Sequence, residues 1–167
     1  MTHPGNRADG SALCLSCGMC CDGTLFTHVA FEPGDAAIEP VFARMTAVAE
    51  GSGRGFAQPC EMLDRRACAI YARRPRPCAR FRCRTLRELD RGWIDVDDAA
   101  SRVDAALSAR AEVMTADGTG APLSELRTRM EQAVGAERRD PAMIALARLE
   151  LVLLRWFRDP PEKPLDH

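Results

Sequence analysis

The chain has 167 residues, of which 46% are hydrophobic, and its net charge of −1 excludes nucleic-acid binding driven by a strongly basic surface. Its length suits one small domain with a modest core. The longest apolar run near the C-terminus, residues 151–154, is far shorter than the ~20 residues of a membrane-spanning helix, and the first 13 residues lack the apolar segment of a secretory signal. We therefore expect a cytoplasmic protein without a membrane partner.

Four segments follow one another along the chain. The predicted fold class is α+β, with a small metal-stabilised, cysteine-rich module of short strands followed by a C-terminal helical segment of about three helices. We expect a disordered tail at 1–13, the cysteine-cluster metal-binding module at 14–92, the helical segment packed on it at 93–158, and a second disordered tail at 159–167.

Within the module, the spacing of apolar residues predicts a strand over 24–31 that ends at Pro33 and Gly34. A short helix is expected over 41–50, and the glycines of 51–55 are typical of a loop. Residues 60–71 read as two short strands around a turn, which would bring Cys60 and Cys68 together.

From Trp93 onward the pattern becomes helical. Apolar residues recur at three- and four-residue steps, and Asp95 and Asp140 are suited to cap two of the helices. Pro141 fits the first position of the last helix. These apolar stripes are typical of core faces; docking of a protein partner through the C-terminal helices is the alternative. The predicted stripes are Val96, Ala100, Val103, Leu107 and Met114, then Leu123, Leu126, Met130 and Val134, then residues 143–157.

The eight cysteines all lie in the first half of the chain and carry the strongest functional signal. Such clustering indicates a metal site or a disulfide framework, and a reducing cytoplasm favours metal. Overlapping CxxC pairs are found in zinc sites, and CxxCxxC supplies three ligands of one four-iron cluster in bacterial ferredoxins. The candidate metal ligands are Cys14, Cys17, Cys20, Cys21, Cys60, Cys68, Cys78 and Cys83.

The adjacent pair Cys20 and Cys21 constrains how these ligands divide. Neighbouring side chains on extended backbone point to opposite faces, so one tetrahedral ion rarely takes both. The pair therefore indicates either two neighbouring sites or a cluster with a bridging sulfur. For two sites, we expect Cys14, Cys17 and one of the pair to share a site with Cys60 or Cys78, each of which follows a proline.

Several other residues have weaker signals. Six arginines near the last cysteines can balance the formal charge of about −2 on each four-thiolate site, and nucleic-acid binding by this run is disfavoured because few aromatic residues accompany it. His28 on the predicted strand is more typical of a structural residue than of a ligand. No catalytic arrangement or single reactive thiol stands out, so the sequence makes no prediction about catalysis. The arginines are Arg73, Arg74, Arg76, Arg80, Arg82 and Arg84.

The motifs resemble those of the YkgJ-type CxxCxxCC cysteine-cluster family of zinc- or iron-chelating proteins. The likeness covers about residues 14–83 and includes Gly18-Met19 before the vicinal pair, Pro59-Cys60, CxIYxxRPxxC over 68–78, and an aromatic residue before Cys83. The chain departs from this pattern at 64–66, where a glycine turn is expected, and at Ala79, where an arginine is expected.

The resemblance implies a cofactor of zinc or iron, with a 4Fe-4S cluster as one form. A related cysteine cluster in flagellin lysine N-methylases is understood to carry an iron-sulfur cluster, although this chain is too short to resemble the whole enzyme. Three functions follow: a metal-binding protein with about two sites, an iron-sulfur redox or group-transfer component, and a thiol-based redox switch. The third is disfavoured because no βαβ unit accompanies the CxxC pairs.

Overall fold

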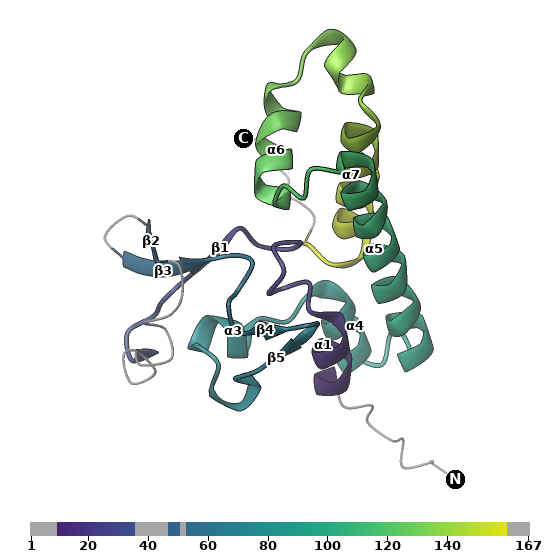
Figure 1. Cartoon of the computed structure of the whole chain (residues 1–167). Helices are drawn as coiled ribbons and strands as arrows, with labels where there is room; N and C mark the ends of the chain where they lie inside the picture. Colours follow the sequence, from purple (N-terminus) through teal and green to yellow (C-terminus); the bar gives the residue numbers. More distant parts are fainter. Residues whose placement is uncertain (1–9, 36–46, 51–52, 160–167) are drawn as a thin grey trace, which may run out of the picture.

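The computed structural model describes residues 10–35, 47–50 and 53–159. It is a mixed α and β structure in which six helices accompany two small antiparallel sheets in the described part of the chain (Figure 1). The elements of the cysteine-rich half are α1 (Gly10–Cys17), β1 (His28–Ala30), β2 (Ala47–Glu50), β3 (Gly53–Ala57), β4 (Leu63–Asp64), β5 (Ala67–Cys68), the 3-10 helix η2 (Tyr71–Arg73), α3 (Arg76–Arg80) and α4 (Arg84–Asp90).

The helical half contains α5 (Val96–Asp117), α6 (Leu123–Gln132), the 3-10 helix η3 (Gly135–Arg139) and α7 (Pro141–Trp156). The two long helices α5 and α7 pack along each other, and α6 lies beside α7 (Figure 1). Both predicted caps are confirmed: the carboxylate of Asp95 accepts a hydrogen bond from the backbone N–H of Asp98 at 2.8 Å, and that of Asp140 accepts one from Ala142 at 2.7 Å. No helix in the described ranges is long and apolar enough to cross a membrane.

The three-stranded sheet differs from the sequence prediction. Its order is β1-β3-β2, so the predicted helix over 41–50 is wrong at 47–50 and the predicted loop over 51–55 is wrong from residue 53; residues 41–46 and 51–52 lie outside the described residues. Gly55 explains the second error. A Cβ atom there would lie 2.4 Å from the carbonyl oxygen of Val29. The glycine therefore allows β3 to lie close to β1 and does not mark a loop.

Other predictions hold in part. The hairpin of β4 and β5 is confirmed, and Arg65 in its turn has a φ of 55°, which explains why a glycine suits this turn. The predicted strand over 24–31 is reduced to β1. The expected N-terminal tail is replaced by helix α1 from Gly10, and its first nine residues, like residues 160–167 of the expected C-terminal tail, lie outside the described residues. Val134 is 70% exposed and lies beyond α6, so it is not a core residue.

The buried residues form two separate cores. The larger one joins α5, α6 and α7 to two residues of the cysteine-rich half, Met19 and Leu25. The smaller one contains Phe56 and Cys60 as its buried residues, with partly buried side chains around them. The larger core therefore includes residues from both sides of the predicted boundary near residue 92.

The cap at Asp95 can be tested against a matched control. Asp95→Ala should lower the free energy of unfolding by about 1 kcal/mol more than Asp97→Ala. Both substitutions remove one carboxylate near the N-terminus of α5, but Asp95, at the N-cap, also bonds the Asp98 N–H. Urea unfolding followed by circular dichroism measures both variants. Equal losses would contradict a capping role for Asp95.

Candidate metal centre

The CxxCxxCC segment folds as a helix followed by a tight turn. Cys14 and Cys17 lie on α1 at a three-residue spacing, which places them on one helical face. Gly18 ends the helix with a φ of 71°, and its carbonyl oxygen accepts hydrogen bonds from the N–H groups of Cys21 at 2.8 Å and Asp22 at 3.1 Å. A Cβ atom at Gly18 would lie 2.8 Å from the carbonyl oxygen of Arg66, so glycine is also needed for contact with the hairpin.

The side chains of Cys20 and Cys21 contact different cores. Cys20 packs against the larger, helical core together with Cys17 and Cys83. Cys21 packs against the smaller core together with Cys78 and the buried Cys60. The divergence expected for adjacent residues therefore separates the cysteines into two groups.

Electrostatic interactions among the thiols give the same division. Cys17 and Cys20 each interact with Cys14 and Cys83, and Cys83 interacts with Cys14. We call Cys14, Cys17, Cys20 and Cys83 the first set.

The second set contains Cys21, Cys60, Cys68 and Cys78. The thiols of Cys21 and Cys68 are joined by a hydrogen bond, and Cys78 interacts with Cys60 and Cys68. The backbone N–H of Cys60 also donates to the carbonyl oxygen of Cys21 at 2.7 Å. The sets are neighbours, since Cys20 also interacts with Cys78.

The distal partner of the first set is Cys83, not Cys60 or Cys78 as the sequence suggested. Cys78 lies on α3 and Cys83 caps α4, with Phe81 in extended conformation between them. The helix is therefore interrupted between Cys78 and Cys83. Because of this break, the two sulfurs belong to different sets.

None of the eight cysteines forms a disulfide, and all are half-buried except Cys60, which is buried. The sulfurs of each set are neighbours rather than an assembled metal site: among the described residues, no three or more Cys, His, Asp or Glu side chains already have metal-binding geometry. Eight cysteines outside disulfides, in two sets of four, nevertheless fit the donor chemistry of zinc and of iron-sulfur clusters.

Burial keeps most of these thiols neutral. It raises the pKa of Cys17 and of Cys78 to about 12, and it raises the pKa of Cys20, Cys60 and Cys83 above the ordinary value. The hydrogen bond between Cys21 and Cys68 raises the pKa of Cys21 and lowers the pKa of Cys68 to about 6. A metal ion would therefore have to displace protons from buried thiols.

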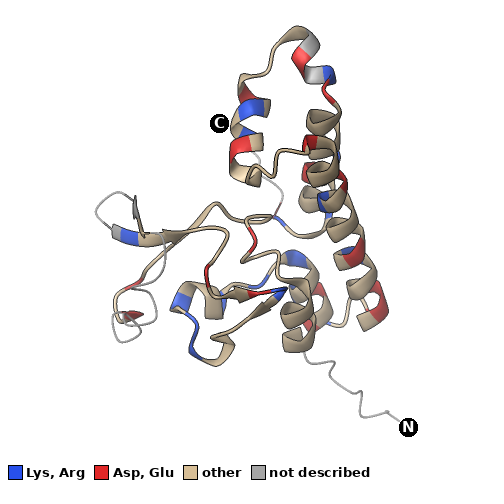
Figure 2. Ribbon diagram, viewed as in Figure 1, with Lys and Arg blue, Asp and Glu red and all other residues tan. Residues whose placement is uncertain are grey.

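Arginines near the last cysteines interact with thiols of both sets. Arg74 interacts with Cys68 and Cys78, and its guanidinium lies 3.6 Å from the centre of the Tyr71 ring. Arg82 and Arg87 interact with Cys83. Arg87 was not singled out from the sequence, because its i+4 spacing from Cys83 becomes informative only once α4 is known. Figure 2 shows basic residues along the segments around α3 and α4.

Three other arginines of this run make structural contacts. Arg80 pairs with Glu32, and Arg84 pairs with Glu88 at 2.8 Å. Arg76 donates to the carbonyl oxygen of Pro33 and, through its backbone N–H, to Asp35, both at 2.9 Å. The run therefore contributes both thiol neighbours and structural contacts, and Arg82 is both, since it also pairs with Asp90 at 2.6 Å.

A cavity of about 370 Å³ lies between the two sets and is lined by every cysteine except Cys60. Aromatic rings form part of its wall, where Phe26 and Phe81 meet edge to face with ring centres 4.7 Å apart. His28 also lines it, and its Nδ1 atom lies 3.0 Å from the hydroxyl of Thr27. The volume is within the range of small-molecule pockets.

These features define a cysteine-rich protein with two adjoining four-thiol sets. Comparison with known proteins agrees with this class: residues 13–97 match the family model described as "CxxCxxCC: Putative zinc- or iron-chelating domain". Because this match covers half of the 167 residues, the chain belongs to the CxxCxxCC family. No curated protein and no solved structure matches the chain.

The pKa shifts predict how the metal-free protein responds to alkali. Because the folded state favours neutral thiols, their contribution to stability is present below the ordinary pKa of 9.0 and is lost as pH rises from there toward about 12 for Cys17. Cys68, whose folded-state pKa is lowered to about 6, has the opposite effect: its contribution to stability grows as pH rises from about 6 to 9. Chelator-treated protein should therefore unfold at lower urea concentration at about pH 11 than at about pH 9.

Cys17→Ser provides the control for this measurement. Serine does not ionise in this range, so the decline between the two pH values should be shallower in the variant than in the wild type. A wild-type protein that gains stability over this interval would contradict the assigned directions.

Proposed function

We propose that the protein is a metal-binding protein that uses its eight cysteine thiolates in two sites, one for each set. The single observation that carries this proposal is the grouping of four thiols around Cys20 and four around Cys21. Four thiolates are a complete ligand set for one zinc ion or one four-iron cluster. A reducing cytoplasm, expected from the sequence, would keep the thiols available for metal.

The charges around the sets support the proposal. A site of four thiolates with zinc, or with an oxidised four-iron cluster, has a formal charge of about −2 and needs neighbouring cations when partly buried. Arg74 supplies a cation beside the second set. Arg82 and Arg87 lie beside the first set, where they also pair with Asp90 and Asp159. The metal would also stabilise the fold, because binding energy at thiolate sites adds to folding energy.

A second candidate is an iron-sulfur component with redox or group-transfer activity. The cavity favours this candidate. A structural zinc site is closed around its ligands and needs no pocket beside them, whereas about 370 Å³ of apolar space could hold a small substrate. In this reading a substrate would lie against both sets. The chain's own contribution would be to exclude water with the Phe26 and Phe81 rings.

The third function expected from the sequence, a thiol redox switch, would use the hydrogen-bonded pair Cys21 and Cys68. Metal ligation of either sulfur would block disulfide formation between them. Metal content therefore distinguishes this reading from the first two.

The proposed function predicts the metal content of the purified protein. Protein purified without oxygen should contain about two zinc ions, or iron with acid-labile sulfide for about two clusters, because eight thiolates make two four-sulfur sites. Elemental and sulfide analysis measure this, and a broad absorption near ~400 nm accompanies iron-sulfur clusters. Less than one equivalent of zinc plus iron, together with a Cys21–Cys68 disulfide, would favour the redox switch.

The proposed function also predicts how the eight cysteines divide between the two metal sites. Cys20→Ser and Cys21→Ser should each lose about half of the metal, but from different sites, because their sulfurs belong to different sets. Cobalt substitution and thiolate-to-cobalt absorption can follow each site.

Two further variants serve as matched controls. Cys83→Ser should reproduce the spectrum of Cys20→Ser, and Cys60→Ser should reproduce that of Cys21→Ser. Loss of the same signal in both vicinal variants would overturn the two-site arrangement in favour of one cluster with a bridging sulfur.

A further inference from the structure

The C-terminal end of α7 holds the segment that carries Cys83. The backbone N–H of Arg84 donates to the carbonyl oxygen of Phe157 at 3.1 Å, and the hydroxyl of Thr85 donates to the carbonyl oxygen of Trp156 at 2.6 Å. Thr85 is fully buried. The position of Cys83 at the start of α4 is therefore fixed against the last turn of α7.

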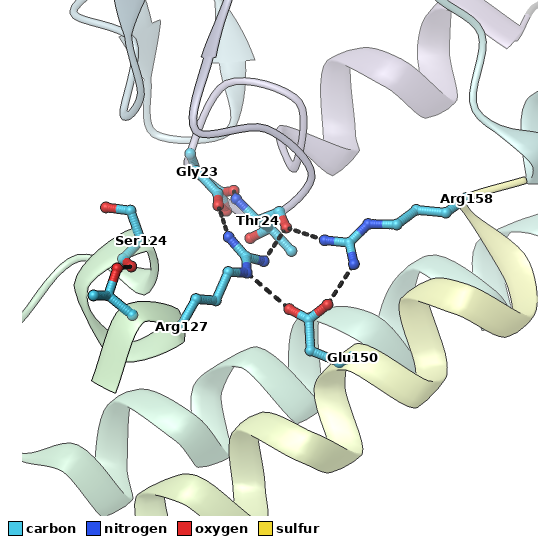
Figure 3. Close-up of polar contacts among 8 residues, drawn as sticks. Gly23, Thr24, Ser124, Arg127, Glu150 and Arg158 are labelled. Atoms are coloured by element: carbon cyan, nitrogen blue, oxygen red, sulfur yellow. Dashed lines mark hydrogen bonds and ion pairs between the residues drawn. The ribbon is translucent and has the colours of Figure 1, made fainter. Parts of the chain in front are cut away.

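Helix α6, tied to α7, holds the turn that follows the vicinal pair Cys20 and Cys21. The guanidinium of Arg127 on α6 donates to the carbonyl oxygens of Gly23 at 2.9 Å and Thr24 at 2.6 Å, and to Glu150 on α7 at 2.8 Å (Figure 3). Arg158, just beyond α7, also donates to Glu150. We call Arg127, Glu150 and Arg158 the Glu150 clamp.

The Arg127–Glu150 pair of the clamp is well protected from water, whereas Arg158 is 30% exposed. The side chains of Arg127 and Glu150 are 16% and 17% exposed, and Thr24 is fully buried. Hydrogen bonds to charged groups are stronger than neutral ones, and more so when solvent is restricted. Loss of the clamp would leave the carbonyl oxygens of the turn without these donors.

Helix α5 adds a third tie to the same turn. Asp22 lies 3.1 Å from the Nε atom of Arg110, and its carboxylate accepts a hydrogen bond from the backbone N–H of Thr24 at 2.8 Å. The turn after the vicinal cysteines is thus held by side chains from the helical half, at residues outside the matched range of 13–97.

The second set is held by different contacts. Cys60 bonds the carbonyl oxygen of Cys21 directly, and Cys68 lies on the β4–β5 hairpin. Cys60 belongs to the smaller core, against which Cys21 and Cys78 pack. These contacts come from within the cysteine-rich half.

We propose that α6 and α7 position the first cysteine set, so that the metal affinity of this set depends on the Glu150 clamp while that of the second set does not. The inference rests on the proposed metal-binding function. The helices bring together the two parts of the first set, which are the CxxCxxCC turn and the Cys83 segment. Coupling is reciprocal, so metal at the first set must in turn stabilise the docking of the helices.

The test isolates one set at a time. In a Cys60→Ser background only the first set is complete, and in a Cys83→Ser background only the second is complete. Zinc affinity is measured in each background by competition with a chromophoric chelator. Arg127→Met should weaken zinc binding by ~10-fold or more in the first background and by less than ~3-fold in the second, in keeping with the usual effect of residues that orient metal ligands.

Matched variants keep the result interpretable. Arg129→Met removes an arginine from the same helix, where it pairs with Asp117 at 3.1 Å, and should leave both affinities unchanged. Glu150→Gln keeps the side-chain volume if Arg127→Met does not fold, and should show the same preference for the first set. Arg127→Lys should recover part of the affinity because it retains the charge and one donor.

The outcomes separate this inference from the proposed function. If neither single-set background binds zinc and wild-type protein holds no metal, the proposed function fails. If wild-type protein binds two equivalents but the clamp variants weaken both sets equally, or neither, the positioning role alone is overturned.

Discussion

The structure depends on the divergence of two adjacent side chains, Cys20 and Cys21. The turn after α1 is fixed by two hydrogen bonds to the carbonyl oxygen of Gly18, and it directs one sulfur to the helical core and the other to the sheet core. Because the two side chains diverge at this turn, one short segment contributes to both cysteine sets. The hairpin, α3 and α4 are then arranged around this turn so that each brings its cysteine to one side of it.

The two cores contribute to stability unequally. The helical core contains many buried apolar residues, whereas Phe56 and Cys60 are the buried residues of the smaller core. A core of that size stabilises little on its own, as is common in small metal-binding modules. Metal at the second set would therefore act chiefly as a folding element of the sheet and hairpin, while metal at the first set would add to a structure that the helices already support.

The cysteine-rich half and the helical half meet through charge as well as through apolar contact. Arginines of the cysteine-rich half interact with thiols or tie its loops, and partly buried arginines of the helical half hold the turn beside the vicinal pair. The family match ends at residue 97, just after α5 begins. The cysteine module is thus combined with helices that reach back to its central turn, and the cavity between the sets opens beside that turn.

Features that depend on near neighbours could be predicted from the residues alone: the helix caps at Asp95 and Asp140, the β4–β5 hairpin, the membership of the CxxCxxCC family and the divergence of Cys20 from Cys21. Features that depend on distant contacts could not. Gly53–Ala57 forms a central strand because Gly55 fits against Val29, and Cys83 joins the first set because α4 docks on the end of α7. Neither contact can be predicted from neighbouring residues. A glycine-rich segment or a cysteine-containing segment has the same local sequence whichever distant part of the chain it packs against.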